Sequence, residues 1–188
     1  MRWLVLRASL WSGAAHAQSA PDALFAAISA KDIAAVQVAL EQSVSADMDP
    51  ATEPQRQRNL VTVFTYTHPA IDTLTTEWLA ADPQNPYAMT ARGGYLSGLS
   101  FAIRGGRFAA NTHPEALRAF RDLQLQAANL FSEAIALDPD LLAASDGVLT
   151  TAASLQRLDT IPAEIERVMT RHPNHFSLRK AMQAAAPQ

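Results

Sequence analysis

The amino-acid sequence predicts an all-α fold made of antiparallel helix pairs. Apolar residues recur at intervals of three and four along most of the 188 residues, which is the period of a helix that buries one face. Three apolar stretches close on a polar step and a proline: Ala81-Asp82-Pro83, Leu137-Asp138-Pro139 and Arg171-His172-Pro173. Because proline cannot continue a helix and restricts the residue before it, each signal predicts a helix end. The chain has no cysteine, so no disulfide can replace helix packing.

Composition and charge describe one globular domain without nucleic-acid partners. Hydrophobic residues make up 48% of the chain and charged residues 18%, which is neither a disordered nor a fibrous composition. The net charge is −3, whereas binding to nucleic acid depends on clustered lysine and arginine. The lack of cysteine also excludes thiolate nucleophiles and cysteine-ligated zinc.

The start of the chain predicts a cleaved leader. A basic start and an apolar stretch lead to Ala15-His16-Ala17, which places small residues where signal peptidase requires them. We expect residues 1–17 to be a signal peptide, and residues 18–188 to be a single helical-repeat domain in the periplasm or secreted. The alternative is an N-terminal helix of a cytosolic protein, since Arg7 interrupts the apolar stretch. No later stretch approaches the roughly 20 apolar residues that span a bilayer, so no stable membrane anchor is expected.

The first helices are expected as a hairpin at about residues 21–45. Between its two apolar periods stand Ser29 and, three residues later, Asp32, a pattern typical of an N-cap. The polar segment that follows contains two prolines and predicts a loop at about residues 46–55. Repeat-like helices are expected from about residue 56 to residue 186.

The segment LVTVFTYT, residues 60–67, can be interpreted in two ways. Its β-branched and aromatic residues suit a strand, but a single strand would have no partner, so we favour a helix that ends before Pro69. In the next helix Trp78 shares a face with Ile71 and Leu74 and is expected in the core.

A helix expected between Pro86 and Ile103 carries small residues on one face: Ala91, Gly94, Gly98 and Ala102. A glycine inside a helix costs up to about 1 kcal/mol relative to alanine, so these glycines require a reason. The favoured interpretation is a stripe that lets a neighbouring helix pack closely. The alternative is a helix broken at Gly93-Gly94 that exposes its backbone to a ligand.

The corner after this helix reads Arg104-Gly105-Gly106-Arg107. We expect the stem of Arg104 to be packed and its charge to be paired with the last helix carbonyls or with an acid on a neighbouring helix. Gly105 and Gly106 would supply the positive φ angles that reverse the chain. Thr112 would cap the next helix, and Arg107 would be exposed toward an anionic partner.

The second half of the chain resembles tetratricopeptide repeats. Pro139 and Pro173 stand 34 residues apart, which is the length of that repeat, and Ala127, Phe131 and Ala134 hold its second-helix spacing. The aromatic, glycine and tyrosine set of its first helix is missing. The stretch from ADPQNPYAMTARGG to LFSEAIALDP is also similar to an uncharacterised bacterial family of tetratricopeptide-like proteins. The resemblance implies helix pairs stacked as a short α-solenoid.

In such a solenoid, Asn85, Arg92 and Tyr95 occupy positions that tend to face the concave groove. An amide, a guanidinium and a phenol suit a peptide carboxylate or backbone, because arginine offers a planar fork of donors. These three residues, together with Arg107, are the candidate binding site. The alternative for this face is a solvated helix surface.

Known catalytic and cofactor patterns do not fit the sequence. GGYLSGLS has the glycine spacing of a phosphate loop but Leu99 where lysine is needed. IRGGRF lacks the three spaced glycines of a dinucleotide site and does not follow a predicted strand. No serine stands in a nucleophile elbow. His172 and His175 suggest a metal pair, but Pro173 breaks the helix that would align them. We expect no metal and no cofactor.

The sequence therefore predicts a non-enzymatic module that binds a protein or peptide partner along a concave helical surface. One rival is an enzyme whose polar residues meet only in the fold, with four candidates: Arg92, Tyr95, Arg104 and His113. A deep pocket holding at least three of them would favour that rival. The other rival is a structural subunit of an envelope assembly, which a large exposed apolar patch would favour.

Overall fold

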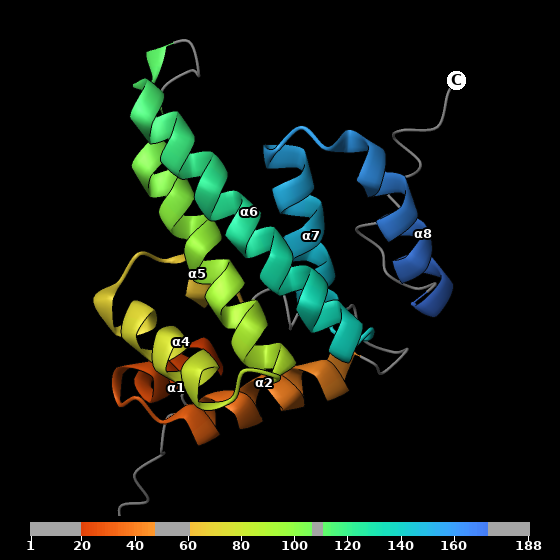
Figure 1. Cartoon of the computed structure of the whole chain (residues 1–188). Helices are drawn as coiled ribbons and strands as arrows, with labels where there is room; N and C mark the ends of the chain where they lie inside the picture. The colour runs from red at the N-terminus through yellow and green to blue at the C-terminus, as the bar shows by residue number, and fades with distance from the viewer. Residues whose placement is uncertain (1–19, 48–60, 107–110, 173–188) are drawn as a thin grey trace, which may run out of the picture.

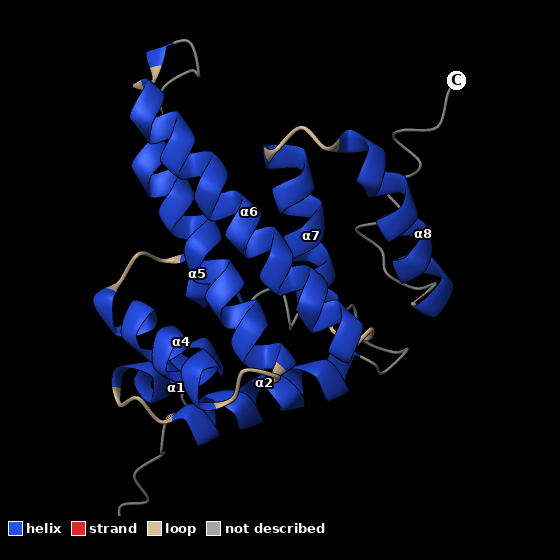
Figure 2. Cartoon of the chain, in the orientation of Figure 1, coloured by secondary structure: helices blue, strands red, loops and turns tan. Residues whose placement is uncertain are grey.

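The computed structural model describes residues 20–47, 61–106 and 111–172, and every regular element in these ranges is helical (Figure 1, Figure 2). The predicted all-α fold is confirmed there. The predicted leader, Arg107, most of the expected loop and the chain beyond His172 lie outside the described residues. The elements are α1 (Ala20–Ser29), α2 (Ile33–Asp47), the 3-10 helix η1 (Val63–Thr65), α4 (Pro69–Ala81), α5 (Pro86–Arg104), α6 (Pro114–Leu137), α7 (Leu142–Ser154), the 3-10 helix η3 (Leu158–Thr160) and α8 (Ile161–Arg171).

The three predicted helix ends are confirmed. α4, α6 and α8 end at Ala81, Leu137 and Arg171, each directly before the polar residue of the predicted signal. In all three, the amide of that polar residue donates to the carbonyl four residues back, which completes the last turn. These ends follow from local sequence, because the proline that comes next has no amide to continue the ladder.

The expected hairpin is formed by α1 and α2, with a different cap from the one predicted. Asp32 caps α2, because its Oδ1 accepts the amide of Ala35 at 3.0 Å. Ser29 instead donates its hydroxyl to the carbonyl of Phe25, one turn back. Lys31, at φ 56°, makes the left-handed turn between the two helices.

The cap of α6 also differs by one residue from the prediction. His113, not Thr112, stands at the N-cap, and its Nδ1 accepts the amide of Glu115 at 3.4 Å. Pro114 takes the first helical position, where the missing amide costs nothing.

The two longest helices, α5 and α6, run side by side through the middle of the molecule (Figure 1). α1, α2 and α4 gather around the first half of α5. α7 packs on α6 and α5, and α8 packs on α7 (Figure 1). α5 is continuous through Gly93-Gly94, so the helix is not broken there.

The segment before Pro69 is helical, as favoured, and it explains the small-residue stripe. η1 crosses α5 so closely that a Cβ at Gly98 would overlap the carbonyl oxygen of Thr65. A Cβ at Gly94 would lie 3.4 Å from the Cβ of Phe64. The close neighbour is therefore the short 3-10 turn rather than a full helix.

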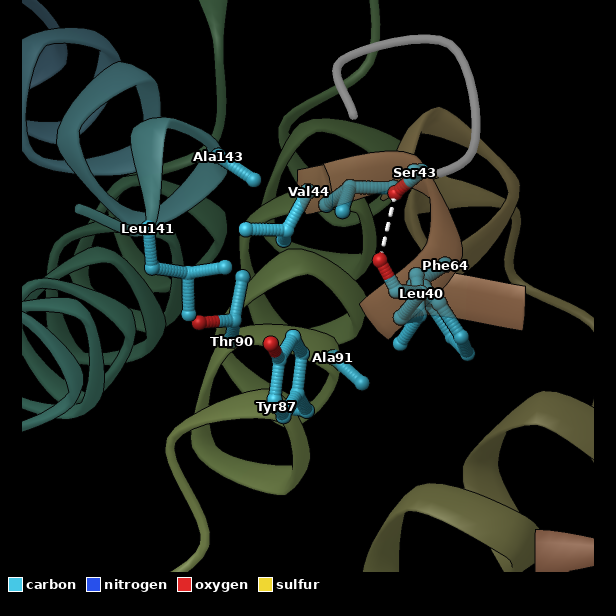
Figure 3. A pocket seen from close by; sticks show the side chains of 10 residues that line it. Leu40, Ser43, Val44, Phe64, Tyr87, Thr90, Ala91, Leu141 and Ala143 are labelled. Carbon is cyan, nitrogen blue, oxygen red and sulfur yellow. Dashed lines mark hydrogen bonds between the residues drawn. The ribbon is translucent and has the colours of Figure 1, made fainter. Parts of the chain in front are cut away.

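A small apolar cavity lies where α2, η1 and α5 meet the start of α7 (Figure 3). Its volume is about 10 Å³, which is barely enough for one water molecule. Leu40, Tyr87 and Leu141 point into it, and Ser43 donates its hydroxyl to the carbonyl of Leu40 at 2.7 Å. This space belongs to core packing and is too small for a ligand.

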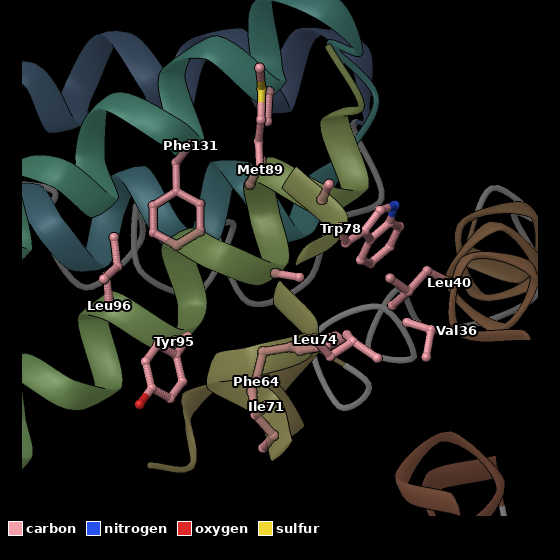
Figure 4. Packing of buried hydrophobic residues seen from close by; sticks show 14 of the residues in the cluster. Val36, Leu40, Phe64, Ile71, Leu74, Trp78, Met89, Tyr95, Leu96 and Phe131 are labelled. Carbon is pink, nitrogen blue, oxygen red and sulfur yellow. The ribbon is translucent and has the colours of Figure 1, made fainter. Parts of the chain in front are cut away.

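Large aromatic side chains fill the core between the helices (Figure 4). Trp78 is buried, as expected, and points from α4 toward α2. Phe131 of α6 is 3% exposed, and its ring lies against two glycines. A Cβ at Gly93 of α5 would lie 2.9 Å from that ring, and one at Gly147 of α7 would lie 2.5 Å from it. The ring therefore joins three helices at one point.

Candidate functional site

Asn85 caps α5 and lies buried rather than on an open face. Its Oδ1 accepts the amides of Tyr87 and Ala88 at 3.0 and 3.1 Å. Its amide nitrogen donates to Gln37 Oε1 and Asp82 Oδ2, both at 3.1 Å. Since its side-chain atoms are engaged and the residue is only 7% exposed, Asn85 holds α2 and α5 together.

Arg92 and Tyr95 form a cluster with α4. Arg92 Nη1 lies 2.6 Å from Asp72 Oδ1 and 3.3 Å from Thr75 Oγ1. The guanidinium carbon stands 5.2 Å from the centre of the Tyr95 ring. Burial raises the pKa of Tyr95, with Asp72 adding to the rise and Arg92 opposing it. The cluster joins two helices with its charges already paired.

In the corner after α5, one of the two glycines has a positive φ angle. Gly105 has φ 71° and ends α5, as predicted, whereas Gly106 has no positive φ. Arg104 is half-buried, and its guanidinium carbon lies 5.4 Å from the centre of the Phe120 ring. Among the described residues, Arg104 therefore contacts an aromatic face and forms no ion pair with the acids that the sequence suggested. His113 is exposed, and Arg107 lies outside the described residues.

A groove of about 510 Å³ opens beside Arg104. We name it the arginine groove. Its walls come from the end of α5, the first half of α6 and the end of α7: Phe101, Arg104, Leu117, Phe120, Arg121, Leu125 and residues 153–157. Its volume lies within the range of ligand pockets. Among the described residues, its lining includes three arginines and no acidic side chain.

Aromatic rings form one wall of the arginine groove. Phe101 and Phe120 meet edge to face with their centres 5.3 Å apart. Phe120 is buried, whereas Phe101 remains 42% exposed. Arg104 lies over Phe120, so this wall presents a cation beside an accessible ring.

The opposite rim is shaped by the turn that ends α7. The amide of Arg157 donates to the carbonyl of Ala152, and the amide of Gln156 donates to that of Ala153. This is the Schellman pattern, in which one residue takes the left-handed conformation that favours glycine. Here Gln156 takes it, at φ 59°. The turn directs the chain so that Arg157 lines the groove.

The charges of the arginine groove are less satisfied than those elsewhere in the fold. Arg92, Arg167 and Arg171 pair with Asp72, Glu164 and Asp140. The guanidinium groups of Arg121 and Arg157 make no ion pair or hydrogen bond with any described residue, and both residues are exposed. Together with Arg104, they give the groove a local positive charge in a chain whose net charge is −3.

The structure separates the residues that the sequence grouped. Of the four candidates for an assembled enzyme site, the arginine groove includes Arg104 alone. Arg92 and Tyr95 lie on the side of α5 that meets α4, and His113 caps α6.

Several groove residues were missed by sequence reasoning. Phe101 had a visible signal, since it shares the last turn of a predicted helix with the candidate Arg104. Phe120 and Arg121 lie on α6, far from Arg104 in the sequence. Arg157 follows Gln156, which has a left-handed backbone conformation although glycine is the residue that usually indicates one. No pattern in the sequence relates these positions to one another.

Comparisons with known proteins give no match: no family model, curated protein or solved structure is similar to the chain. Within the described ranges, no helix is long and apolar enough to cross a membrane. The same residues contain no group of three or more histidine, cysteine, aspartate or glutamate side chains placed to hold a metal ion.

Proposed function

We propose that the chain is a non-enzymatic module that binds a protein or peptide partner, and that the arginine groove is its docking surface. One observation carries the proposal: the groove contains two exposed guanidinium groups without an ion-pair partner among the described residues, and an accessible aromatic ring lies in the same groove. Arginine and aromatic side chains are the residues that contribute most at binding interfaces.

The distribution of polar residues supports binding over catalysis. An assembled catalytic site needs its acid, base and nucleophile within hydrogen-bond reach of one reacting atom. Arg92 is engaged with Asp72, and His113 stands at a helix start with 73% of its side chain exposed. The groove instead offers charge and apolar surface, which suffice for recognition.

The architecture extends this proposal. The pairs α5–α6 and α7–α8 follow one another, and α6 packs on α7, which is the contact expected between neighbouring units of a tetratricopeptide-like solenoid. The leader-like residues 1–17 add the proposal that binding takes place in the periplasm or outside the cell.

Site-specific photo-crosslinking tests the proposal. A photoreactive phenylalanine analogue replaces Leu117 inside the arginine groove, and in a matched variant it replaces Gln126, an exposed residue further along α6. Both variants are produced in the native cells and irradiated. We expect a discrete adduct from the Leu117 position only, whose protein is identified by mass spectrometry, produced separately and shown to bind the purified chain.

Two results would contradict the proposal. One is equal adducts at both positions, which would indicate contact without a specific surface. The other is a purified partner that binds equally well when Arg104, Arg121 and Arg157 are all replaced by glutamine.

A further inference from the structure

We infer that the arginine groove recognises a carboxylate next to an apolar side chain on a peptide segment. The inference rests on the proposed function and adds the chemistry of the partner. It follows from the character of the two walls and from the helix ends that meet at the groove.

The carboxylate is indicated by the groove's charges. Arg121 and Arg157 are exposed and unpaired within the described part of the chain, and no acidic side chain there lines the groove. A guanidinium presents two parallel N–H donors that match the two oxygens of a carboxylate, and such charged hydrogen bonds are about twice as strong as neutral ones. A carboxylate bound in the groove would therefore supply the acidic partner that these arginines lack among the described residues.

The apolar neighbour is indicated by the apolar side chains that line the groove beside the arginines. Phe101 is 42% exposed although it packs edge to face against Phe120, and Leu117 and Leu125 line the same space. Burying this apolar surface against an apolar side chain of the partner is favourable. A volume of about 510 Å³ accommodates a short peptide segment with one large side chain rather than a folded domain.

The helix ends favour one carboxylate over a polyanion. The last turns of α5 and α7 both line the groove, so it is bordered by two helix C-termini. A helix C-terminus carries a partial negative charge of about half an elementary charge. These ends favour the positive charges of Arg104 and Arg157, which stand next to them, but oppose a dense negative ligand. A phosphate would be better placed at a helix N-terminus.

The choice of a peptide follows from the proposed function, in which the partner is a protein or peptide. A peptide carries a carboxylate and an apolar side chain on one backbone, so one short segment can supply both groups.

Short fluorescent peptides of one length test the inference on the full chain. An amidated peptide with glutamate next to phenylalanine is compared with one in which glutamine replaces the glutamate and one in which serine replaces the phenylalanine. A fourth peptide has no acidic side chain and ends in phenylalanine with a free carboxylate. Fluorescence anisotropy gives each dissociation constant, and inorganic phosphate and anionic vesicles serve as competitors.

We expect each replacement in the first peptide to weaken binding by about tenfold, the loss of one charged contact or one buried ring. The variants Arg121→Gln and Arg157→Gln should weaken binding of the acidic peptides and leave that of the glutamine peptide unchanged. Arg118→Gln is the matched control, because Arg118 is exposed on α6 outside the groove. Thermal melts confirm that each variant is folded. The glutamate peptide carries its carboxylate on a side chain, and the fourth peptide carries it at the C-terminus. The peptide with the lower dissociation constant identifies which source of carboxylate the groove prefers.

The outcomes separate the two levels of the proposal. Equal binding of the glutamate and glutamine peptides, abolished by the groove variants, would overturn the carboxylate inference and keep the proposed function. Binding of vesicles or phosphate in preference to every peptide would overturn the inference in favour of another anion. If no peptide binds and the crosslinking experiment also yields no partner, both levels fail.

Discussion

Arg92 Nη1 lies 2.6 Å from Asp72 Oδ1, and this ion pair joins α5 to the first turn of α4. The acid stands where the helix dipole favours it, and the arginine also lies over the Tyr95 ring. The pair is therefore part of the packing between two helices, although the sequence presents Arg92 as a ligand-binding residue.

The first prediction follows from this pair. Arg92→Ala should lower the free energy of unfolding by about 1–2 kcal/mol, because it removes a half-buried ion pair and a cation–π contact. Urea unfolding measures the loss, and Arg118→Ala, on an exposed surface, should change it by less than about 0.5 kcal/mol. If the two variants are equally stable, the ion pair does not support the packing of α4 on α5, and Arg92 would again be a candidate binding residue.

The second prediction concerns Gly98. Because a Cβ there would overlap the backbone of Thr65, even Gly98→Ala should destabilise the fold by about 1–3 kcal/mol, and Gly98→Leu by more. Gly106→Ala is the control, since a Cβ at Gly106 meets nothing within 4 Å and its φ is not positive. A Gly98→Ala protein that melts like the wild type would show that η1 does not cross α5 here.

The third prediction uses the left-handed residue at the end of α7. Gln156→Gly should raise the free energy of unfolding by about 0.5–1 kcal/mol, because glycine takes φ 59° without a Cβ penalty. Gln126→Gly, inside α6, should lower it by about 1 kcal/mol. The same change in both variants would mean that Gln156 does not hold a left-handed angle in solution.

The fourth prediction is that the free energy of unfolding falls in two steps as the pH is lowered, one from His172 and one from Asp140. Burial lowers the pKa of His172, although Asp140 lies 3.3 Å from its Nε2 and opposes the shift without forming a hydrogen bond of good geometry. The hydrogen bond from Arg171 lowers the pKa of Asp140. A group with a lowered pKa stabilises the fold above its unfolded value and loses that contribution as the pH falls.

Stability should therefore begin to fall below about pH 6.5 because of His172, and fall again below about pH 3.8 because of Asp140. Urea unfolding from pH 8 to pH 3 measures both parts. His172→Gln should remove the first part and leave the second. A stability that rises as the pH falls from 7 to 5 would mean that Asp140, rather than burial, controls the imidazole.

The fifth prediction concerns the leader. If Ala15-His16-Ala17 is a cleavage signal, the protein exported by a Gram-negative host should begin at Gln18. N-terminal sequencing decides this, and a chain that still begins with Met1 would contradict both the leader and the location outside the cytoplasm.

The parts of the fold that the sequence predicted are those controlled by neighbouring residues. The helix ends at Ala81, Leu137 and Arg171 follow from local signals, and the close contact at Gly98 was indicated by a glycine that a helix does not favour. Asn85 had a local signal too, since an asparagine before a proline is typical of a helix cap. The resemblance to a tetratricopeptide repeat favoured a different role for Asn85, as a binding residue on the concave face.

The arginine groove could not be predicted in the same way. Arg104, Arg121 and Arg157 come together only because α5, α6 and the end of α7 meet at a particular angle. That angle depends on ring and glycine contacts between residues far apart in the sequence, such as Phe131 with Gly147. Local periodicity gives the buried face of each helix but not the place where three helices converge.

The ring of Phe131 also connects the core to the arginine groove. It rests against Gly93 on one side and against Gly147, near the middle of α7, on the other. A larger side chain at Gly147 would have to displace the ring or α7 itself. Because the end of α7 and the turn after it line the groove, displacing α7 would move Arg157 as well. The position of one arginine at the surface therefore depends on a glycine that packs against the core.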